Sequence, residues 1–374
     1  MLAAALGIRL IFWLGKILPT PAPRRVLEAL RSVEVTSDIE QGDGFQLTFE
    51  LTKSWRGDFD LLDGGALSPW NRVVLGVQLG TSLRVLCDGV IAHHQLQPSG
   101  EGQDSAATLT VTGTSLAVLL DQSEVSRKYP NQADAVIAAQ ILARYARYGL
   151  VPDVRPTGDI PLSIQRVPWQ HGTDLACLER MAERNAFVFY IEPVTMGIGR
   201  AYFGPDNRLS VPQKALTVDM GGSSNVTSLH FSHDAALPQQ STGRFYAPGT
   251  QTTLPVPALP ALRIPPLALR PTTAKRQLIL RDAAKLNLSQ AIQRARGLQA
   301  QSGDSVRGQG ELDSVRYGDI LRARRLVGVR GAGRSYDGIY YVGHVTHHIE
   351  RGKYTQSFAL RREGTGSLTP VVRP

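Results

Sequence analysis

The sequence is poor in cysteine, with only Cys87 and Cys177 among its 374 residues. Two cysteines so far apart do not form the disulfide framework of a small secreted protein. They could pair only if the fold brought their Cα atoms within reach. We therefore expect two buried thiols in a protein that is made in a reducing cytoplasm.

The sequence also lacks an apolar run long enough to span a membrane, which needs roughly 20 residues. The opening MLAAALGIRLIFWLGKIL is apolar, but Arg9 and Lys16 interrupt it. No positive charge precedes its apolar part, as it would in a signal peptide. We expect Ile8 to Leu18 to form a buried first strand, with a targeting role for residues 1–18 as the alternative.

Motifs of catalysis and nucleotide binding are missing as well. There is no G-x-S-x-G, and the glycine-rich VGVRGAG has neither the lysine of a phosphate-binding loop nor the order G-x-G-x-x-G. Glu179 and Glu183 lie one helical turn apart, but the neighbouring Arg180 and Arg184 indicate a solvated face. A carboxylate pair that converges from distant positions stays open. The sequence predicts no enzyme, no catalytic residue and no cofactor.

Histidines are the remaining candidates for chemistry. On a strand, His344 and His348 share one face and His347 points to the other, and the same alternation separates His93 from His94. A zinc site needs converging ligands, and no paired Cys or His motif supplies the further donors. We expect packing or interface histidines, and no metal.

Positive charge is plentiful, with a formal net charge of +9. The densest basic run is Arg322 to Arg325, with Arg330 and Arg334 beyond it. This run falls in a strand pattern without interleaved aromatic residues, which favours a solvated or partner-facing strand edge. Nucleic-acid binding through the basic surface is the alternative function, because a positive balance permits contact with anions.

Period-two alternation predicts strands in the first third of the chain. Phe45 to Leu51 places Phe and Leu on one face and Gln, Thr and Glu on the other. A short helix at Arg25 to Arg31 is expected to carry Val26, Leu27 and Leu30. Further strands are predicted at Ser32–Thr36, Val73–Leu79, Leu83–Cys87, Val90–Leu96 and Ala107–Val111. Short, closely spaced strands are typical of an antiparallel barrel or sandwich.

Helical patterns dominate the next segment, starting with a turn or two at Ser115 to Asp121. The spacing predicts a helix over Asn131 to Tyr148, capped by Asn131 and ended by Gly149. A second helix is predicted over Asp174 to Asn185, with Thr173 as its N-cap and a strand at Ala186–Glu192 after it. Two helices and a strand suggest a small α+β insertion beside the barrel.

Strands return beyond Pro205, at Ala215–Val218 and Val226–Phe231. Thr252 to Pro271 contains six prolines and is expected to be an extended strap on the surface or between subunits. A third helical stretch is predicted over Ala274 to Gln301, followed by a terminal sheet. The last residues, Thr365 to Pro374, are expected to be loose.

The terminal sheet holds a predicted hairpin. Gly338 to Glu350 and Lys353 to Arg362 read as strands, and Arg351-Gly352 between them suits a tight turn that needs positive φ. The alternation predicts that one dry face of the first strand carries Ile339, Tyr341, Val345 and Ile349.

Three sequence motifs follow one another in this region and resemble a known family: VRGAG, YDGIYYV and VTHHIERGKYTQSFALRREG. With TDLACLERMAERNAFVFY and the opening PTPAPRRVLEALRSVEVTSD, they resemble the tail-hub proteins of contractile phage tails and phage-tail-like injection systems. These belong to the late control protein D class, which is related to the N-terminal half of VgrG spikes. The signature positions are expected to be structural: Gly331, Gly333, Asp337, Gly338, Tyr340, Tyr341, Gly352 and Phe358.

The resemblance implies a β-rich α+β fold, with two tube-protein-like antiparallel β-barrel domains and a small α+β insertion between them. The domains it suggests are residues 1–120 for the first barrel, 121–210 for the insertion, 211–272 for returning strands and strap, 273–364 for a helix with the second barrel, and 365–374 for a flexible tail.

The implied function is that of a structural baseplate hub made in the bacterial cytoplasm and assembled into a tail or tail-like particle. A homotrimeric ring would adapt a trimeric spike to the six-fold inner tube, among other baseplate components, with no specific nucleic acid and no membrane as partners. VgrG proteins continue into a needle, whereas this sequence ends after the hub signature. The resemblance therefore implies a spike on a separate polypeptide.

Overall fold

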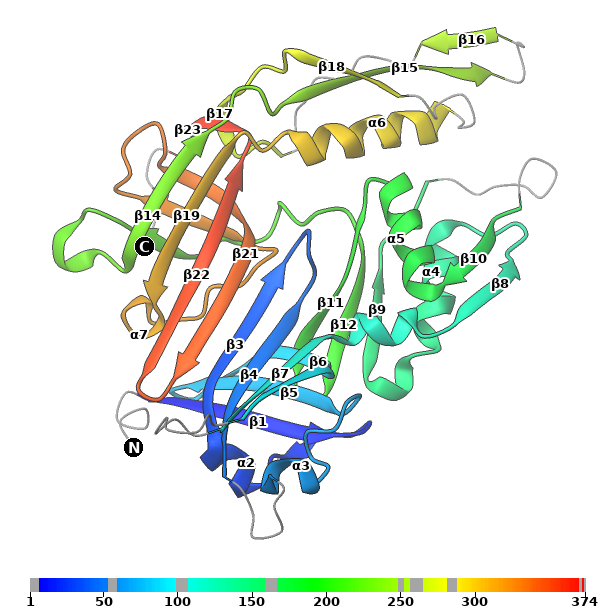
Figure 1. Cartoon of the computed structure of the whole chain (residues 1–374). Helices are drawn as coiled ribbons and strands as arrows, with labels where there is room; N and C mark the ends of the chain where they lie inside the picture. The colour runs from blue at the N-terminus through cyan, green and yellow to red at the C-terminus, as the bar shows by residue number, and fades with distance from the viewer. Residues whose placement is uncertain are drawn as a thin grey trace.

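The computed structural model describes residues 7–52, 59–98, 107–158, 167–247, 252–255, 265–280, 288–369 and 372. Its main feature is a 13-stranded, mostly antiparallel sheet that contains strands from both ends of the chain. Figure 1 shows the blue N-terminal strands beside the orange and red C-terminal strands, with the helices of the insertion at one side. None of the described helices is long and apolar enough to span a bilayer.

The N-terminal strands form one part of this sheet, in the order β3-β4-β7-β6-β5-β1-β2. Their bounds are β1 Ile8–Gly15, β2 Thr20–Pro21, β3 Leu30–Asp38, β4 Gly44–Leu51, β5 Arg72–Leu79, β6 Ser82–Gln97 and β7 Ala107–Ser115. The alternation predicted for Phe45 to Leu51 is confirmed, because Phe45, Leu47, Phe49 and Leu51 are buried in an apolar core. The two strands predicted at Leu83–Cys87 and Val90–Leu96 are one, since β6 runs through Asp88 and Gly89.

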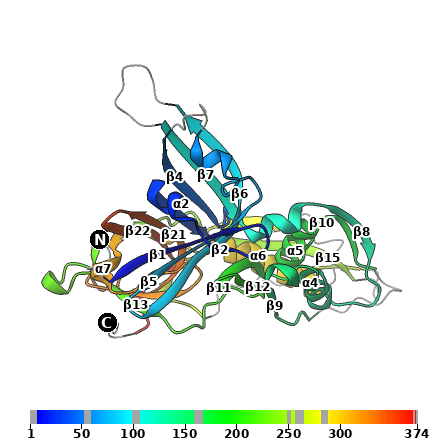
Figure 2. The same cartoon turned by 90° about the horizontal axis from the view of Figure 1, so that it is seen from below.

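Two short helices, α2 (Arg24–Ala29) and α3 (Asp60–Asp63), accompany the N-terminal strands. Of the side chains predicted on the apolar face of this helix, Val26 in α2 and Leu30, the first residue of β3, are buried, but Leu27 is 42% exposed. The predicted first strand ends at Gly15, and Leu18 is exposed, because the chain turns there into β2. In the perpendicular view of Figure 2, β4, β6 and β7 project away from the terminal hairpin and the insertion.

The insertion (residues 116–204) forms an α+β unit around a second apolar core, to which Val90 of β6 also contributes. Its elements are η1 Leu116–Asp121, β8 Glu124–Lys128, α4 Asp134–Ala143, η2 Ala146–Tyr148, β9 Leu150–Val154, β10 Trp169–Thr173, α5 Asp174–Arg184, β11 Val188–Thr195 and β12 Ile198–Gly204. Strands β11, β12 and β9 form a sheet, and β8 pairs with β10. Thr173 caps α5 as predicted, since its hydroxyl accepts a hydrogen bond from the Ala176 amide.

The predicted cap at Asn131 is wrong. Asn131 has a positive φ of 56°, and α4 begins three residues later at Asp134. The same helix ends at Ala143, and a 3-10 turn replaces its predicted last residues before Gly149, whose φ of 74° is the left-handed value expected. The apolar spacing located the helix, whereas its ends depend on local backbone conformation.

The terminal strands form the other part of the large sheet and surround a third apolar core. Their bounds are β13 Gln213–Thr217, β14 Val226–His233, β19 Val306–Asp313, β20 Leu326–Arg330, β21 Gly338–Glu350 and β22 Lys353–Arg362, with the short helix α7 at Ser314–Tyr317. The predicted hairpin is confirmed residue for residue, and Gly352 has the positive φ (82°) that its turn requires. Pairing of β21 with β3 joins the two parts of the sheet.

An arm of β15 (Gln239–Ala247), β16 (Thr252–Pro255), β18 (Arg276–Leu280) and α6 (Leu288–Ser302) lies along one side of the molecule (Figure 1). Residues 276–280 were predicted to be helical, but they pair as a parallel strand with β15. Within the predicted strap, β16 and β17 (Ala268–Pro271) are strands, and residues 256–264 lie outside the described residues. Part of the predicted loose tail is ordered too, since β23 (Gly364–Ser367) pairs with β17.

Candidate assembly surface

The hairpin of β21 and β22 connects two apolar cores. Tyr340, Val342 and Val345 contribute to the core of the terminal strands, whereas Ile349 and Tyr354, near the turn, belong to the core of the N-terminal strands. Pairing of β21 with β3 runs from His344–Asp38 to Glu350–Ser32. The hairpin is therefore both the backbone link and the packing link between the two parts of the sheet.

The single dry face predicted for β21 is wrong. The register between β21 and β22 shifts between Val342 and His344, which leaves Gly343 as an extra residue and reverses the facing of the side chains. Ile339 and Tyr341 consequently pack in a small cluster with Leu267 and Leu326, away from Val345. A bulge of one residue changes every later position in a period-two pattern.

His347 lies at the boundary between the two cores and is 3% exposed. Its Nδ1 is 2.8 Å from the Tyr354 hydroxyl and 3.1 Å from Nε2 of the buried Gln356. Burial, with the nearby charges of Arg322 and His348, lowers the pKa of His347 to about 3. The imidazole is thus neutral near pH 7 and acts as a hydrogen-bonding core residue.

His344 lies on the opposite face and takes part in a chain that resembles a catalytic triad. Its Nδ1 is 2.7 Å from Asp38 Oδ2, and its Nε2 is 2.9 Å from the Thr346 hydroxyl. Thr346, however, is 6% exposed, and its hydroxyl also contacts that of Thr36 across the β3–β21 pair. A nucleophile needs a free approach for its substrate, so this chain connects two strands instead of forming an active site.

Asp38 is the anchor of this chain. Burial alone would raise the pKa of its carboxyl, but hydrogen bonds from the amides of Gln41 and Glu40 and from His344 lower the pKa below its ordinary value. His348 contacts Glu34 and Ser357 at the same surface. Among the residues that the structure describes, no three His, Cys, Asp or Glu side chains are placed to hold a metal ion.

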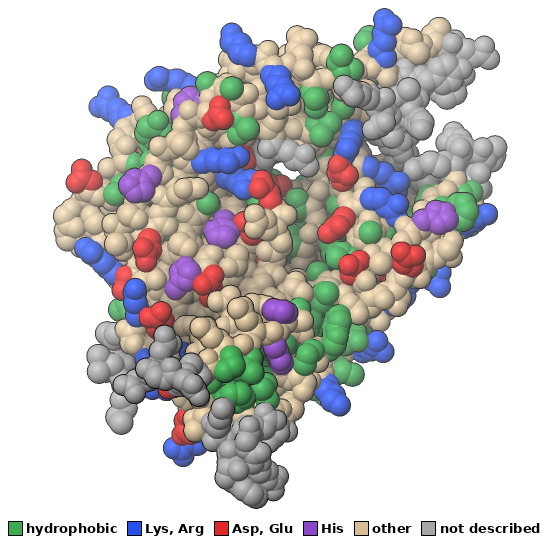
Figure 3. Space-filling model, in the orientation of Figure 1, with side chains coloured by type: hydrophobic (Ala, Val, Ile, Leu, Met, Phe, Trp, Pro, Cys, Tyr) green, Lys and Arg blue, Asp and Glu red, His purple; other side chains and the backbone are tan. Residues whose placement is uncertain are grey.

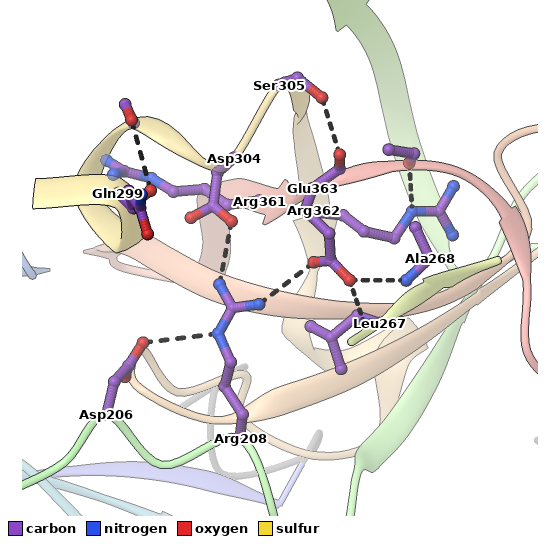
Figure 4. A network of polar contacts seen from close by, with 12 residues as sticks. Asp206, Arg208, Leu267, Ala268, Gln299, Asp304, Ser305, Arg361, Arg362 and Glu363 are labelled. Atoms are coloured by element: carbon purple, nitrogen blue, oxygen red, sulfur yellow. Dashed lines mark hydrogen bonds and ion pairs between the residues drawn. The ribbon is translucent and has the colours of Figure 1, made fainter. Parts of the chain in front are cut away.

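A second connection is the charged node around Arg208, which Figure 4 shows at close range. Arg208 follows the insertion and is 4% exposed. Its guanidinium donates to Asp304 Oδ1 at 2.9 Å and to Glu363 Oε2 at 3.2 Å, and its Nε lies 3.6 Å from Asp206. Burial alone would lower the pKa of Arg208, but these three carboxylates raise it, so the cation is retained.

Glu363 extends the node to the start of β17 and to the segment between α6 and β19. Its carboxylate accepts hydrogen bonds from the backbone amides of Leu267 and Ala268, and its carbonyl accepts one from the Ser305 hydroxyl. Arg208, Ala268, Ser305 and Glu363 come from four separate segments of the chain. The node therefore fixes where the arm leaves the sheet (Figure 4).

The signature positions occupy backbone turns and core sites. Gly331, Gly333, Gly338 and Gly352 all have positive φ, which favours glycine. At Gly331 a Cβ atom would come within 1.9 Å of the Val218 carbonyl oxygen, so the close approach of two backbones requires glycine there. The other four positions are in ordered contacts: Asp337 accepts from the Ala332 amide, the Tyr340 hydroxyl donates to the Tyr336 carbonyl, and Tyr341 and Phe358 are buried.

The basic run Arg322 to Arg325 is a turn and not the predicted strand. Arg324, with a φ of 61°, contacts Asp43 through two nitrogens and lies 4.6 Å from the Tyr190 ring centroid. Arg325 forms an ion pair with Glu192. Basic and acidic side chains are interspersed on the face drawn in Figure 3. Two of the arginines that suggested a nucleic-acid surface, Arg324 and Arg325, are thus paired with carboxylates of the same chain.

The described sheet ends at β14, at β13, which pairs only with β20, and at β1 with β2. At one end, β14 pairs only with β19, although Asn225 just before it is bonded to Ala215 and Thr217 of β13. At the other end, the first half of β1 pairs only with β5. A groove of about 310 Å³ lies beside this edge and is lined mainly by apolar side chains, including Ile8, Leu10, Val33 and Ile349.

No protein-family model matches the sequence, and no curated protein does either. Solved structures do match. A tail protein from Neisseria meningitidis MC58 aligns over 95% of this chain and 97% of its own, with a TM-score of 0.63 and 13% identity. The 43 kDa tail protein of prophage MuSo2 from Shewanella oneidensis aligns over 95% and 98%, with a TM-score of 0.64 and 13% identity. The chain has the fold of a phage tail protein.

This tail-protein fold also occurs in a secretion system. A component of the type VI secretion system of E. coli, described as structurally similar to T4 bacteriophage tail proteins, aligns over 92% of this chain and 77% of its own. Its TM-score is 0.53 and its identity 13%. At such identity the comparison establishes the fold and not the activity.

Sequence reasoning missed the Arg208 node and the Asp38–His344–Thr346 chain. The partners of Arg208 are 96 and 155 residues away, and those of His344 include a residue 306 positions earlier. The spacing of residues within a short stretch of sequence cannot predict pairs that are so far apart in the chain. Glu363 directly follows Arg361 and Arg362, so its charge does not stand out in the sequence either.

Proposed function

We propose that this protein is the structural hub of a baseplate in a contractile tail or injection system. Three copies would form a ring that seats a separate trimeric spike protein on one side and starts the inner tube on the other, in contact with other baseplate components. The observation that carries the proposal is the tail-protein fold over 95% of the chain. The hub signature at Gly331 to Phe358 supports it.

The ring would use the open edges of the sheet. Unpaired strand edges invite pairing with another chain, and the apolar groove beside β1 offers area to bury on contact. In this proposal the two parts of the sheet act as tube-protein-like barrels. The bonds of Asn225 to Ala215 and Thr217 support that reading for the terminal strands, since they connect β13 to the start of β14. The hub has no enzymatic role in this scheme.

Sedimentation of the purified chain, alone and with its spike, tests the proposal. We expect a species of three times the 40.7 kDa chain mass. The variant Leu10→Lys places a charge in the groove and should shift the distribution towards monomer. Leu18→Lys is its matched control, because Leu18 is 80% exposed and outside the groove. If the unaltered chain is strictly monomeric both alone and with its spike, the proposal is contradicted.

A further inference from the structure

A small cavity of about 130 Å³ lies in the insertion, where the β8–β10 pair meets α5. Tyr129 and Gln170 form its fixed floor, and both are buried. The Tyr129 hydroxyl donates to Gln170 Oε1 at 2.8 Å, and Gln170 Nε2 donates to Asp174 Oδ1 at 2.6 Å. These hydrogen bonds within the protein hold the side chains of the floor in place before any ligand binds.

Arg180 and Arg184 reach the cavity from α5, one helical turn apart on the same face. Arg184 is neutralised, because Asp134 accepts from its Nε at 2.6 Å and from Nη2. On the solvated face predicted for this helix, Glu179, Arg180 and Glu183 are exposed and Arg184 is half-buried. Arg180 differs: its Nε donates to the Ala176 carbonyl at 3.2 Å and its Nη2 to the His171 carbonyl at 2.6 Å.

These two carbonyl contacts hold the Arg180 guanidinium in place without cancelling its charge. Within the described part of the chain, no carboxylate is in ion-pair contact with Arg180. A cation that is oriented but not neutralised, beside a small cavity, is suited to bind a carboxylate from outside.

An aromatic side chain completes the rim. Trp169 lines the cavity and is 53% exposed. Its ring is 3.9 Å from the His171 ring between centroids, Lys128 Nζ lies 5.0 Å from its centroid, and its Nε1 donates to the Ser126 hydroxyl. Exposed Trp next to Arg is a combination enriched in binding hot spots. The indole offers apolar area beside the cationic cavity.

We propose that this cavity binds an acidic side chain from a partner protein, with an adjacent apolar residue of that partner packed on Trp169. The cavity of about 130 Å³ has room for one carboxylate side chain. Arg127 and Lys128, both exposed, add positive potential around it. The site is on the insertion, away from the sheet edges that the proposed ring would use (Figure 1), and does not depend on the hub role.

Calorimetric titration of the full chain with a blocked pentapeptide of alternating leucine and glutamate tests the site. A matched peptide with glutamine in place of glutamate should bind at least about ten-fold more weakly, because only a carboxylate answers the charge of Arg180. Arg180→Gln should weaken the glutamate peptide about ten-fold or more, and Trp169→Ala should weaken both peptides. Arg147→Gln is the control: Arg147 is exposed on the same insertion but does not line the cavity, so affinity should stay within about two-fold.

Equal binding of the two peptides, unchanged affinity in Arg180→Gln, or no saturable binding at millimolar peptide would overturn the proposal. The affinities of the two peptides for the unaltered chain test the proposal even if a variant fails to fold. Sedimentation of Arg180→Gln should match that of the parent chain. Loss of peptide binding is thereby distinguished from a failure to form the ring.

Discussion

The N-terminal strands and the terminal strands share one sheet, but their interiors differ in chemistry. Between residues 7 and 115 the described buried polar side chains are those of Arg72 and Asp88, which pair with each other at 2.6 Å. From Arg208 onwards the interior contains a larger polar set: Arg208, Thr217, Asn225, Ser241, Gln299, Asp304, Ser305, Ser314, Thr346, His347, Thr355, Gln356, Arg362 and Glu363. The N-terminal part is held mainly by apolar contact, whereas the terminal part adds many specific polar partners to its apolar core.

The difference matters for how each part responds to change. Apolar contacts are non-directional, so a neighbour can relax into lost volume. A buried charge cannot adapt in this way, because only its oppositely charged partner offsets the free energy cost of its desolvation. We therefore expect the terminal strands and the arm to be sensitive to single polar substitutions, and the N-terminal strands to be sensitive mainly to lost volume.

Removal of the central cation of the node should have the largest effect. Arg208→Met leaves Asp304 and Glu363 buried without their cation, and we expect a loss of about 3–5 kcal/mol in the free energy of unfolding. Urea denaturation measures it. Arg24→Met removes an ion pair on an exposed helix face and should leave the midpoint unchanged. Similar midpoints for the two variants would show that the node contributes nothing specific.

A volume change in the apolar core should come next. Leu47→Ala removes a fully buried side chain from β4, for an expected loss of about 3 kcal/mol. Leu96→Ala, at a position that is 40% exposed, is the matched control and should cost far less. The same denaturation assay applies. A cost for Leu47→Ala as small as that of its control would remove the contrast between the two interiors.

The pH response of His347 should be smaller. Its pKa is about 3 in the folded state against an ordinary 6.5, so acid protonates the unfolded state first and stability falls as the pH drops below 6.5. Between pH 6.5 and 5.5 this residue should account for about 1 kcal/mol of the loss. His347→Gln should flatten the dependence of unfolding on pH in that window. His230→Gln, at an exposed position on β14, should not; equal slopes in both variants would refute the assignment.

Local patterns accounted for much of the fold. Strict alternation located β4, and the Arg351-Gly352 turn located both strands of the hairpin to the residue. The pattern failed where one residue altered it: Gly343 adds a position to β21, and nothing in its neighbours indicates whether the strand absorbs it. The helix predicted at residues 276–280 is wrong, because these residues form a strand by pairing with β15, and the sequence around them does not show that contact.

The candidate assembly surface was less accessible from the sequence. A tight turn with positive φ was predicted at Gly352, and its φ of 82° confirms that part. The destination of Arg324 was not deducible, because Asp43 lies 281 residues earlier in the chain. Arg180 and Arg184 could not be told apart from the sequence either, because the carboxylate that pairs with Arg184 comes from another helix.

The hairpin that spans both cores also has a mechanical consequence. A force that pulls the N-terminal strands away from the terminal strands acts across the β3–β21 ladder, whose paired residues run from His344–Asp38 to Glu350–Ser32, and it loads the hydrogen bonds of this ladder together. The same displacement has to draw Ile349 and Tyr354 out of their core. Tension therefore meets many bonds loaded in parallel, and the two parts of the sheet transmit a load as one stiff element.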